Sequence, residues 1–137
     1  MNYIETLGSR AQAVRSRLAT ASTDAKNQML ENIAQKLVER IPQILEANEK
    51  DLADAQNHGI AEVMIDRLRL TTERIEDIAA ACRKLITLED PVGQVVGGSR
   101  RPNGMKIEKV RVPMGVIGII FESRPNVTVD AAVLCIK

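Results

Sequence analysis

Apolar residues recur along the first 88 positions at alternating steps of three and four, the spacing that lines one face of a helix. The first stripe runs from Ile4 to Leu18. Ser22 or Thr23, followed by Asp24, has the residue types of a helix N-cap and predicts the start of a second helix. Pro42 should interrupt that helix, since proline lacks the amide N–H and clashes with the preceding turn. The second stripe consists of Met29, Leu30, Ile33, Leu37 and Val38.

A third helix is expected to run on past Pro42, which is tolerated in a first helical turn, and to end at His58-Gly59. A short helix over 62–68 follows. Thr71 or Thr72 then offers the N-cap of another helix. Its apolar stripe consists of Ile75, Ile78, Ala79, Cys82, Leu85 and Ile86. The pattern therefore predicts an all-helical layer up to residue 88.

The pattern changes from helical to extended at the turn cluster Asp-Pro-Val-Gly, residues 90–93. Two extended segments, 95–99 and 105–112, flank Asn103-Gly104, a pair that favours the positive φ angles of a tight hairpin turn. The second segment is charged on both faces. We expect a β-hairpin whose second strand reaches solvent or a partner subunit rather than a core.

Residues 115–121 are apolar at every position and rich in Val and Ile, as in a strand buried on both faces of a parallel sheet. The polar sequence Glu-Ser-Arg-Pro-Asn follows at 122–126, and a helix is expected from about Asn126. No glycine cap ends this helix and no returning strand follows it, so we expect the chain to stop within a domain.

The predicted fold class is α/β. It combines a helical layer, a β-hairpin and the first β-α unit of a Rossmann-like dinucleotide-binding domain. The expected divisions are 1–90 for the helical part, 91–112 for the hairpin and 113–137 for the incomplete dinucleotide-binding fold.

The composition limits the classes of protein to which this chain could belong. Apolar residues make up 45% and charged residues 27%, as in soluble globular chains, and no apolar run approaches the roughly 20 residues of a membrane span. The N-terminus lacks the basic and apolar regions of a secretory signal, and two cysteines make no disulfide framework. Cytoplasmic residence without a membrane span is the expectation.

Charge is unevenly distributed, with 12 Lys and Arg against 15 Asp and Glu in residues 1–90, and 7 against 3 in residues 91–137. The basic excess would suit a phosphorylated ligand, an acidic partner or nucleic acid. One Tyr and one Phe leave almost nothing for stacking on bases, so we do not expect nucleic-acid binding.

The loop 122–126 is the first candidate site, because open α/β sheets bind ligands beyond the carboxyl ends of their strands. Arg124 could pair with phosphate or carboxylate, Ser123 could hydrogen-bond a ligand, and Asn126 could cap the helix or donate to an oxyanion. In the competing interpretation, Glu122 and Arg124 are solvated loop charges and Asn126 is only a cap.

Other candidate residues carry less chemistry. Gly115 and Gly118 form no GxGxxG, and no GxxxxGK[ST] occurs, so a dinucleotide would have to be held differently. Cys135 has no visible histidine or cationic partner, which favours packing over a nucleophilic role, and Cys82 lies within a helical stripe. His58 is the only histidine, and its spacing from the cysteines suits no metal site. We assign no metal.

The run from Lys109 to Ala132 closely resembles the gamma-glutamyl phosphate reductase family, also called glutamate-5-semialdehyde dehydrogenases, within the aldehyde dehydrogenase superfamily. Glu-Ser-Arg-Pro-Asn-Val-Thr (122–128) is a hallmark of the family. The similarity continues upstream through 67–70, 90–93 and 101–105. It implies NADPH-dependent reduction of L-glutamyl 5-phosphate to L-glutamate 5-semialdehyde and phosphate in L-proline biosynthesis, through a cysteine thioester.

The resemblance also implies roles for particular residues. The nicotinamide side of the cofactor cleft would be lined by Ile120, Phe121 and Glu122. The substrate loop would contain Ser123, Arg124 and Asn126, with Asn126 a candidate oxyanion donor. The family nucleophile lies in a later segment, and Cys135 does not match its motif. No catalytic residue is therefore expected in this chain, which covers the first third of the usual enzyme and should be inactive alone.

The hairpin resembles the oligomerisation element of the superfamily, which implies a homo-oligomer. The family also implies a glutamate 5-kinase partner. Two alternatives are a non-catalytic helical module that binds an acidic partner, and another superfamily member that acts on a non-phosphorylated aldehyde.

Overall fold

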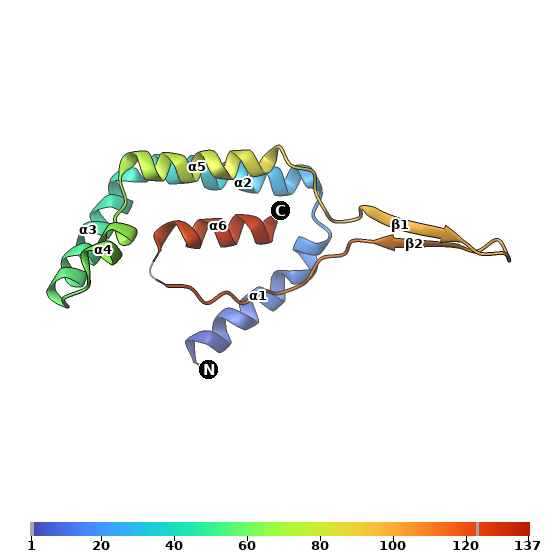
Figure 1. Cartoon of the computed structure of the whole chain (residues 1–137), viewed down its shortest axis with the longest axis horizontal. Coiled ribbons are helices and arrows are strands. Elements are labelled where there is room, and N and C mark those ends of the chain that lie inside the picture. The colour runs from blue at the N-terminus through green and yellow to red at the C-terminus, as the bar shows by residue number, and fades with distance from the viewer. Residues whose placement is uncertain (1, 123) are drawn as a thin grey trace.

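The structure, a computed structural model, describes residues 2–122 and 124–137. Helices alternate with short connections in the first part of the chain, a two-stranded sheet follows, and a last helix returns to the others (Figure 1). The elements are α1 (Tyr3–Ala19), α2 (Thr23–Glu39), α3 (Ile41–Asn57), α4 (Glu62–Leu68), α5 (Thr72–Ile86), β1 (Val95–Arg100), β2 (Lys106–Val110) and α6 (Pro125–Ile136). The predicted helical layer and hairpin are confirmed.

Local signals set the helix boundaries. The Ser22 hydroxyl accepts a hydrogen bond from the Ala25 N–H at 3.2 Å, and α2 begins at the next residue. Thr71 caps α5 in the same way. Pro42 occupies the first turn of α3, as predicted, and Gly59 follows that helix with a φ of +67°.

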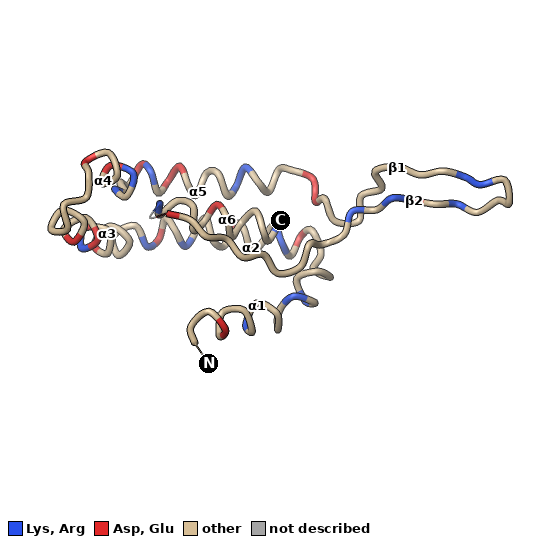
Figure 2. Tube along the Cα trace, turned by 60° about the horizontal axis from the view of Figure 1, so that its bottom comes forward, with Lys and Arg blue, Asp and Glu red and all other residues tan. Residues whose placement is uncertain are grey.

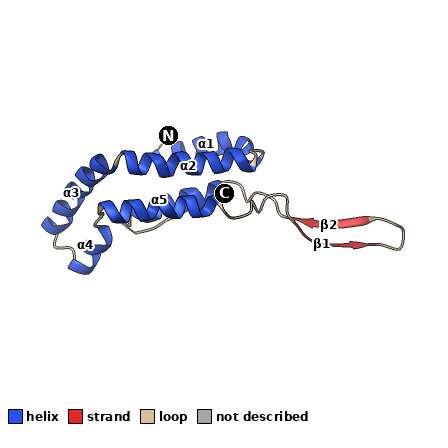
Figure 3. Cartoon of the chain, turned by 90° about the horizontal axis from the view of Figure 1, so that it is seen from above, coloured by secondary structure: helices blue, strands red, loops and turns tan. Residues whose placement is uncertain are grey.

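The core lies where α2, α5 and α6 meet. Its fully buried apolar side chains are Leu30, Ala34, Ala79, Cys82 and Val133. α2 and α5 run side by side over much of their length (Figures 1 and 3), and α6 packs against both. The last helix thus shares one core with the helical layer.

A buried ion pair joins three segments at one end of this core. Lys26 Nζ donates to Asp90 Oδ2 at 2.8 Å, and the two side chains are only 4% and 10% exposed. The same ammonium lies 3.4 Å from the Lys137 carbonyl oxygen, and Lys137 Nζ donates to Asn27 Oδ1 at 2.7 Å. These contacts tie α2 to the base of the hairpin and to the end of α6.

Opposing effects act on the pKa of Asp90. Burial alone would raise the pKa, but hydrogen bonds from Lys26, from the Val92 N–H and from Thr23 outweigh it and lower the pKa below the ordinary value of an aspartate. Asp90 therefore stays ionised and holds the Lys26 ammonium.

The hairpin extends away from the helices (Figure 1), and both strands are exposed along their length. β1 and β2 pair antiparallel, with Ser99 opposite Ile107. Of the turn pair, only Gly104 has a positive φ, +87°. Figure 2 shows mostly Lys and Arg along the hairpin, where Glu108 on β2 pairs with Lys106, whereas α2 and α5 carry both charge signs. The predicted exposure of the second strand is confirmed.

The segment 115–121 differs from the prediction. It forms no strand, and its residues are exposed, with Ile120 fully so at 103%. A buried parallel strand needs strands on both sides, and within residues 2–122 and 124–137 the only sheet is the hairpin. In this chain the predicted buried strand is wrong, and α6 stands without its β-α partner.

Helix α1 is also less covered than its pattern predicted. The helix forms over the expected range, but none of its residues is buried, and Ile4 is 70% exposed. No helix in the described parts of the chain is long and apolar enough to cross a membrane.

Candidate functional site

Two open cavities lie beside the loop before α6, and they share Arg124 and Pro125 as lining residues. The first, of about 610 Å³, lies between this loop and α3 and α4. The second, of about 410 Å³, lies between the loop and the connection from α4 to α5. The loop that the sequence singled out therefore borders both cavities.

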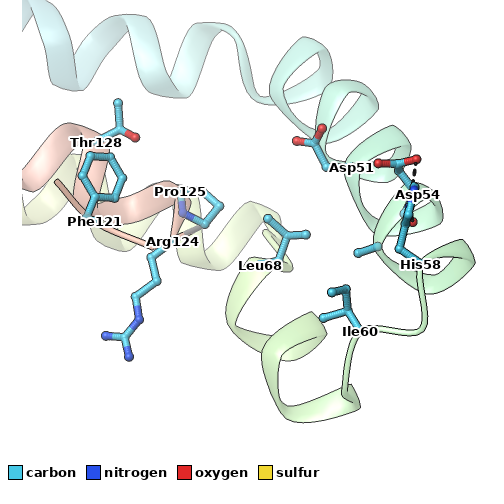
Figure 4. A pocket seen from close by; sticks show the side chains of 10 residues that line it. Asp51, Asp54, His58, Ile60, Leu68, Phe121, Arg124, Pro125 and Thr128 are labelled. Atoms are coloured by element: carbon cyan, nitrogen blue, oxygen red, sulfur yellow. Dashed lines mark hydrogen bonds and ion pairs between the residues drawn. The ribbon is translucent and has the colours of Figure 1, made fainter.

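The first cavity has an acidic side. Figure 4 shows Asp51, Asp54 and His58 projecting from α3, across the cavity from Phe121. The His58 ring Nδ1 lies 2.8 Å from the Asp54 carbonyl oxygen and 3.5 Å from its carboxylate Oδ1. In this view the Arg124 side chain extends away from the α3 carboxylates. An anionic ligand would be repelled from the α3 side of this cavity.

The residues expected at a cofactor cleft are only partly gathered. Phe121 lines the first cavity and is 46% exposed. Ile120 and Glu122 are exposed but line neither cavity. Because the segment has no neighbouring strand, the structure brings Phe121 to a cavity without assembling a cleft around all three residues.

The residues expected in the substrate loop lie at the start of α6. Ser123 is outside the described residues. Arg124 borders both cavities, and Asn126 lines the second. Arg124 is the residue that precedes α6, but it makes no side-chain cap.

The predicted capping role of Asn126 is wrong. Its side-chain Nδ2 donates to Asp130 Oδ2 at 3.2 Å, one turn further along α6. Helix α6 begins instead with Pro125, whose missing N–H costs nothing in a first turn. An oxyanion role for Asn126 stays a prediction, and it would use the second N–H of this amide, because the first is donated to Asp130.

The two cysteines have different environments. Cys82 is buried, as predicted, and burial followed by the nearby Asp130 carboxylate raises the pKa of its thiol. Cys135 is exposed, so the expectation that it packs in a core is wrong for this chain. It lies on α6 outside the face that contributes Val133 to the core. Within the described residues, no group of three His, Cys, Asp or Glu side chains is placed to hold a metal.

One buried polar residue escaped the sequence reasoning. Asn48 on α3 is 4% exposed, its Nδ2 donates to the Leu68 carbonyl at 2.9 Å, and its Oδ1 accepts from the Leu70 N–H at 2.8 Å. Its sequence signal is position, because it lies midway along the apolar stripe that includes Leu45 and Leu52. A polar residue at a core position predicts a buried hydrogen-bonding role.

A set of basic residues was also missed as a site. Arg67, Arg69 and Arg74 line the second cavity together with Arg124. The sequence Arg-Leu-Arg-Leu (67–70) indicates only the family resemblance. Nothing in the spacing showed that it meets a loop more than fifty residues later.

Comparisons with known proteins show which chains this one is similar to. No protein-family model matches the chain. Over 137 residues it is 50% identical to the gamma-glutamyl phosphate reductase of Carboxydothermus hydrogenoformans, covering 100% of this chain and 33% of that protein. Over 134 residues it is 51% identical to the same-named protein of Thermobifida fusca, covering 98% and 32%.

Solved structures agree with these relatives. The crystal structure of gamma-glutamyl phosphate reductase from Thermotoga maritima matches with a TM-score of 0.94 at 41% identity, over 98% of this chain and 33% of that one. By sequence and by fold, the chain matches the N-terminal region of gamma-glutamyl phosphate reductases.

The match to gamma-glutamyl phosphate reductases extends to a more distant organism. The reductase of Saccharomyces cerevisiae has a TM-score of 0.91 at 31% identity, over 99% of this chain and 35% of that one. The chain spans about one third of the length of the gamma-glutamyl phosphate reductases it resembles.

Proposed function

We propose that this chain contributes the N-terminal part of an enzyme that reduces L-glutamyl 5-phosphate to L-glutamate 5-semialdehyde and phosphate in L-proline biosynthesis. The observation that carries the proposal is the match over the whole chain to proteins named gamma-glutamyl phosphate reductase, at 50% and 51% identity. In the hallmark sequence 122–128, Arg124 lies just before α6 and Pro125 begins it, and both residues line the two cavities. The described part of this loop is therefore accessible to a small substrate.

NADPH is the proposed cofactor, and it would supply the hydride. Ile120 and Phe121 would contribute apolar surface to one face of a nicotinamide ring, and the support for this is that both side chains are exposed next to the loop. Glu122 would lie at the edge of that face. Neither standard phosphate loop occurs in the chain, so the dinucleotide phosphates would be held by other residues.

The substrate would bind on the other side of the loop. Arg124 would pair with the phosphoryl group, Ser123 would hydrogen-bond the substrate, and Asn126 would donate to the oxyanion that forms as a thiolate attacks the acyl carbon. We propose that this thiolate belongs to a cysteine outside the 137 residues, which forms the thioester and releases phosphate. Cys135, exposed on α6, is not assigned this role.

The apolar segment 115–121 would become a strand when further strands lie beside it, giving the first β-α unit of a Rossmann-like domain. Its support is the exposed run of apolar side chains, which has no cover in this chain. The hairpin would serve a homo-oligomer, because both of its strands are exposed and unpaired at their outer edges. A glutamate 5-kinase partner and a cytoplasmic location belong to the same proposal.

The test compares this chain with a form extended over the full length of its relatives. Both would be assayed in the reverse direction, as phosphate-dependent reduction of NADP in the presence of L-glutamate 5-semialdehyde. We expect activity only in the longer form. A folded longer form without this activity would refute the proposed reaction. Activity in the 137-residue chain would refute the proposal that the nucleophile lies outside it.

A further inference from the structure

The second cavity gathers charges from segments far apart in the sequence. Four arginines and two aspartates line it: Arg67, Arg69, Arg74, Arg124, Asp66 and Asp77. Arg74 and Asp66 form an ion pair, with 3.2 Å between Nη2 and Oδ1. Apart from this pair, three arginines and one aspartate line the cavity, so its net charge is positive. An anion would therefore be attracted to this cavity rather than to the one with the acidic α3 side.

Two of these guanidinium groups have no protein partner in the described parts of the chain. Arg69 comes from the connection between α4 and α5, and Arg124 comes from the loop before α6. Neither side chain makes a hydrogen bond or an ion pair with a described residue, whereas Arg74 makes several. Two unpaired guanidinium groups beside one cavity offer donors to an incoming anion without first breaking an ion pair.

The connection that carries Arg69 is held in place from two sides. On one side, the buried Asn48 amide bonds both the Leu68 carbonyl and the Leu70 N–H. On the other, Arg74 Nη1 donates to the carbonyls of Asp66 and Arg69, each at 2.7 Å. The backbone at Arg69 is thus fixed before any ligand arrives, which lowers the ordering cost of binding.

We propose that Arg69 and Arg124 together form a subsite for an oxyanion group of a small substrate. The planar fork of a guanidinium matches the oxygen pairs of phosphate and of carboxylate. The inference rests on the proposed function, which supplies a substrate carrying both groups, a phosphoryl group at one end and an amino-acid carboxylate at the other. Asn48 and Arg74 are positioning residues, because they act through the backbone at Arg69.

The experiment titrates the chain with inorganic phosphate and, separately, with L-glutamate, while following the Nε–H resonances of its arginines. We expect the signals of Arg69 and Arg124 to shift together with one dissociation constant. Arg10 on α1 serves as the matched reference, since it is an exposed arginine that lines neither cavity. The ligand that shifts the pair at the lower concentration identifies the oxyanion as phosphate or carboxylate.

Substitutions then test the pair. Arg69→Ala and Arg124→Ala should each raise the dissociation constant of that ligand about tenfold, the effect of losing a charge-assisted hydrogen bond at an open site. Arg10→Ala should leave it within about twofold, because screening weakens a distant exposed charge. Arg69→Lys should fall between wild type and Arg69→Ala, since it keeps the charge but loses the fork. Circular dichroism of each variant verifies that the helices are intact.

The subsite is overturned if Arg69→Ala behaves like Arg10→Ala toward both ligands, or if neither ligand shifts the two arginines. Failure of the proposed function would look different. The longer form would then lack phosphate-dependent reduction of NADP, while the titration of Arg69 and Arg124 would be unchanged. If reductase activity is present and the titration fails, the reaction stands and the subsite does not.

Discussion

Two apolar regions of this chain have opposite environments. The stripes on α2 and α5 meet α6 and form a core in which Leu30 has no exposed surface. The segment 115–121 is more continuously apolar, yet all of it is exposed. The sequence predicted burial for both. An apolar sequence therefore indicated that a segment is more stable when it is buried. Whether it is buried depended on whether another element of the chain packs against it.

The difference follows from backbone hydrogen bonding. A helix satisfies most of its N–H and C=O groups internally, so α2 needs only a neighbour for its apolar face. A buried strand needs neighbouring strands for its backbone as well as cover for its side chains. The described residues supply no strand beside 115–121.

Substitution of a core leucine should show the largest effect. Leu30→Ala is expected to lower the free energy of unfolding by about 4 kcal/mol, because it removes a fully buried side chain and leaves a cavity. Urea unfolding followed by helical circular dichroism measures the change. Leu7→Ala, on the uncovered face of α1, is the matched control and should cost less than about 0.5 kcal/mol. Equal losses would contradict the contrast between the two regions.

Breaking the buried ion pair should come next. Lys26→Met is expected to cost about 3 kcal/mol, because it leaves the Asp90 carboxylate without its cation. Removing both charges, as in Lys26→Met with Asp90→Asn, should restore most of this loss. If the double variant is as unstable as the single one, the pair is not what joins α2 to the base of the hairpin.

The same pair predicts a pH dependence. The pKa of Asp90 is lowered in the folded state, so its contribution is present above the ordinary pKa and is lost as pH falls further through the folded value. The window therefore begins below about pH 4, the ordinary value for aspartate. Wild type should lose more stability there than the double variant, as measured by urea unfolding at each pH.

Loss of the buried amide should have a smaller effect. Asn48→Ala is expected to cost about 2 kcal/mol, because it leaves the Leu68 carbonyl and the Leu70 N–H without partners. Asn32→Ala, at an exposed position of α2, controls for the change of residue type and should cost less than about 0.5 kcal/mol. An effect of Asn48→Ala no larger than this control would mean that the amide does not hold the connection between α4 and α5.

The smallest effect is expected in the exposed apolar segment. Ile120→Ala should change the stability of this chain by less than about 0.5 kcal/mol, because the side chain is already fully exposed. In a form extended over the full length of the relatives, the same substitution should cost about 3 kcal/mol if the segment becomes a buried strand. A negligible effect in both forms would refute the proposed strand.

The candidate site was predictable only in part. The sequence pointed to the loop at 122–126, and the structure places Arg124 beside both cavities. The sequence did not indicate that Arg69 is a neighbour of that loop, because the proximity of Arg69 to the loop depends on how α6 packs against α5. The apolar environment predicted for Cys135 failed for a similar reason, since the helix periodicity did not say which face of α6 would meet the core.

By itself, the sequence determined where the helices begin and end. Ser22, Pro42 and Thr71 act on groups within a few residues of themselves, so their effects do not depend on the rest of the chain. Only the tertiary structure decided which apolar surfaces are covered, and that Asn48 holds the connection carrying Arg69. Burial and long-range hydrogen bonds require a partner at a particular place, and that place is set by the packing of whole elements.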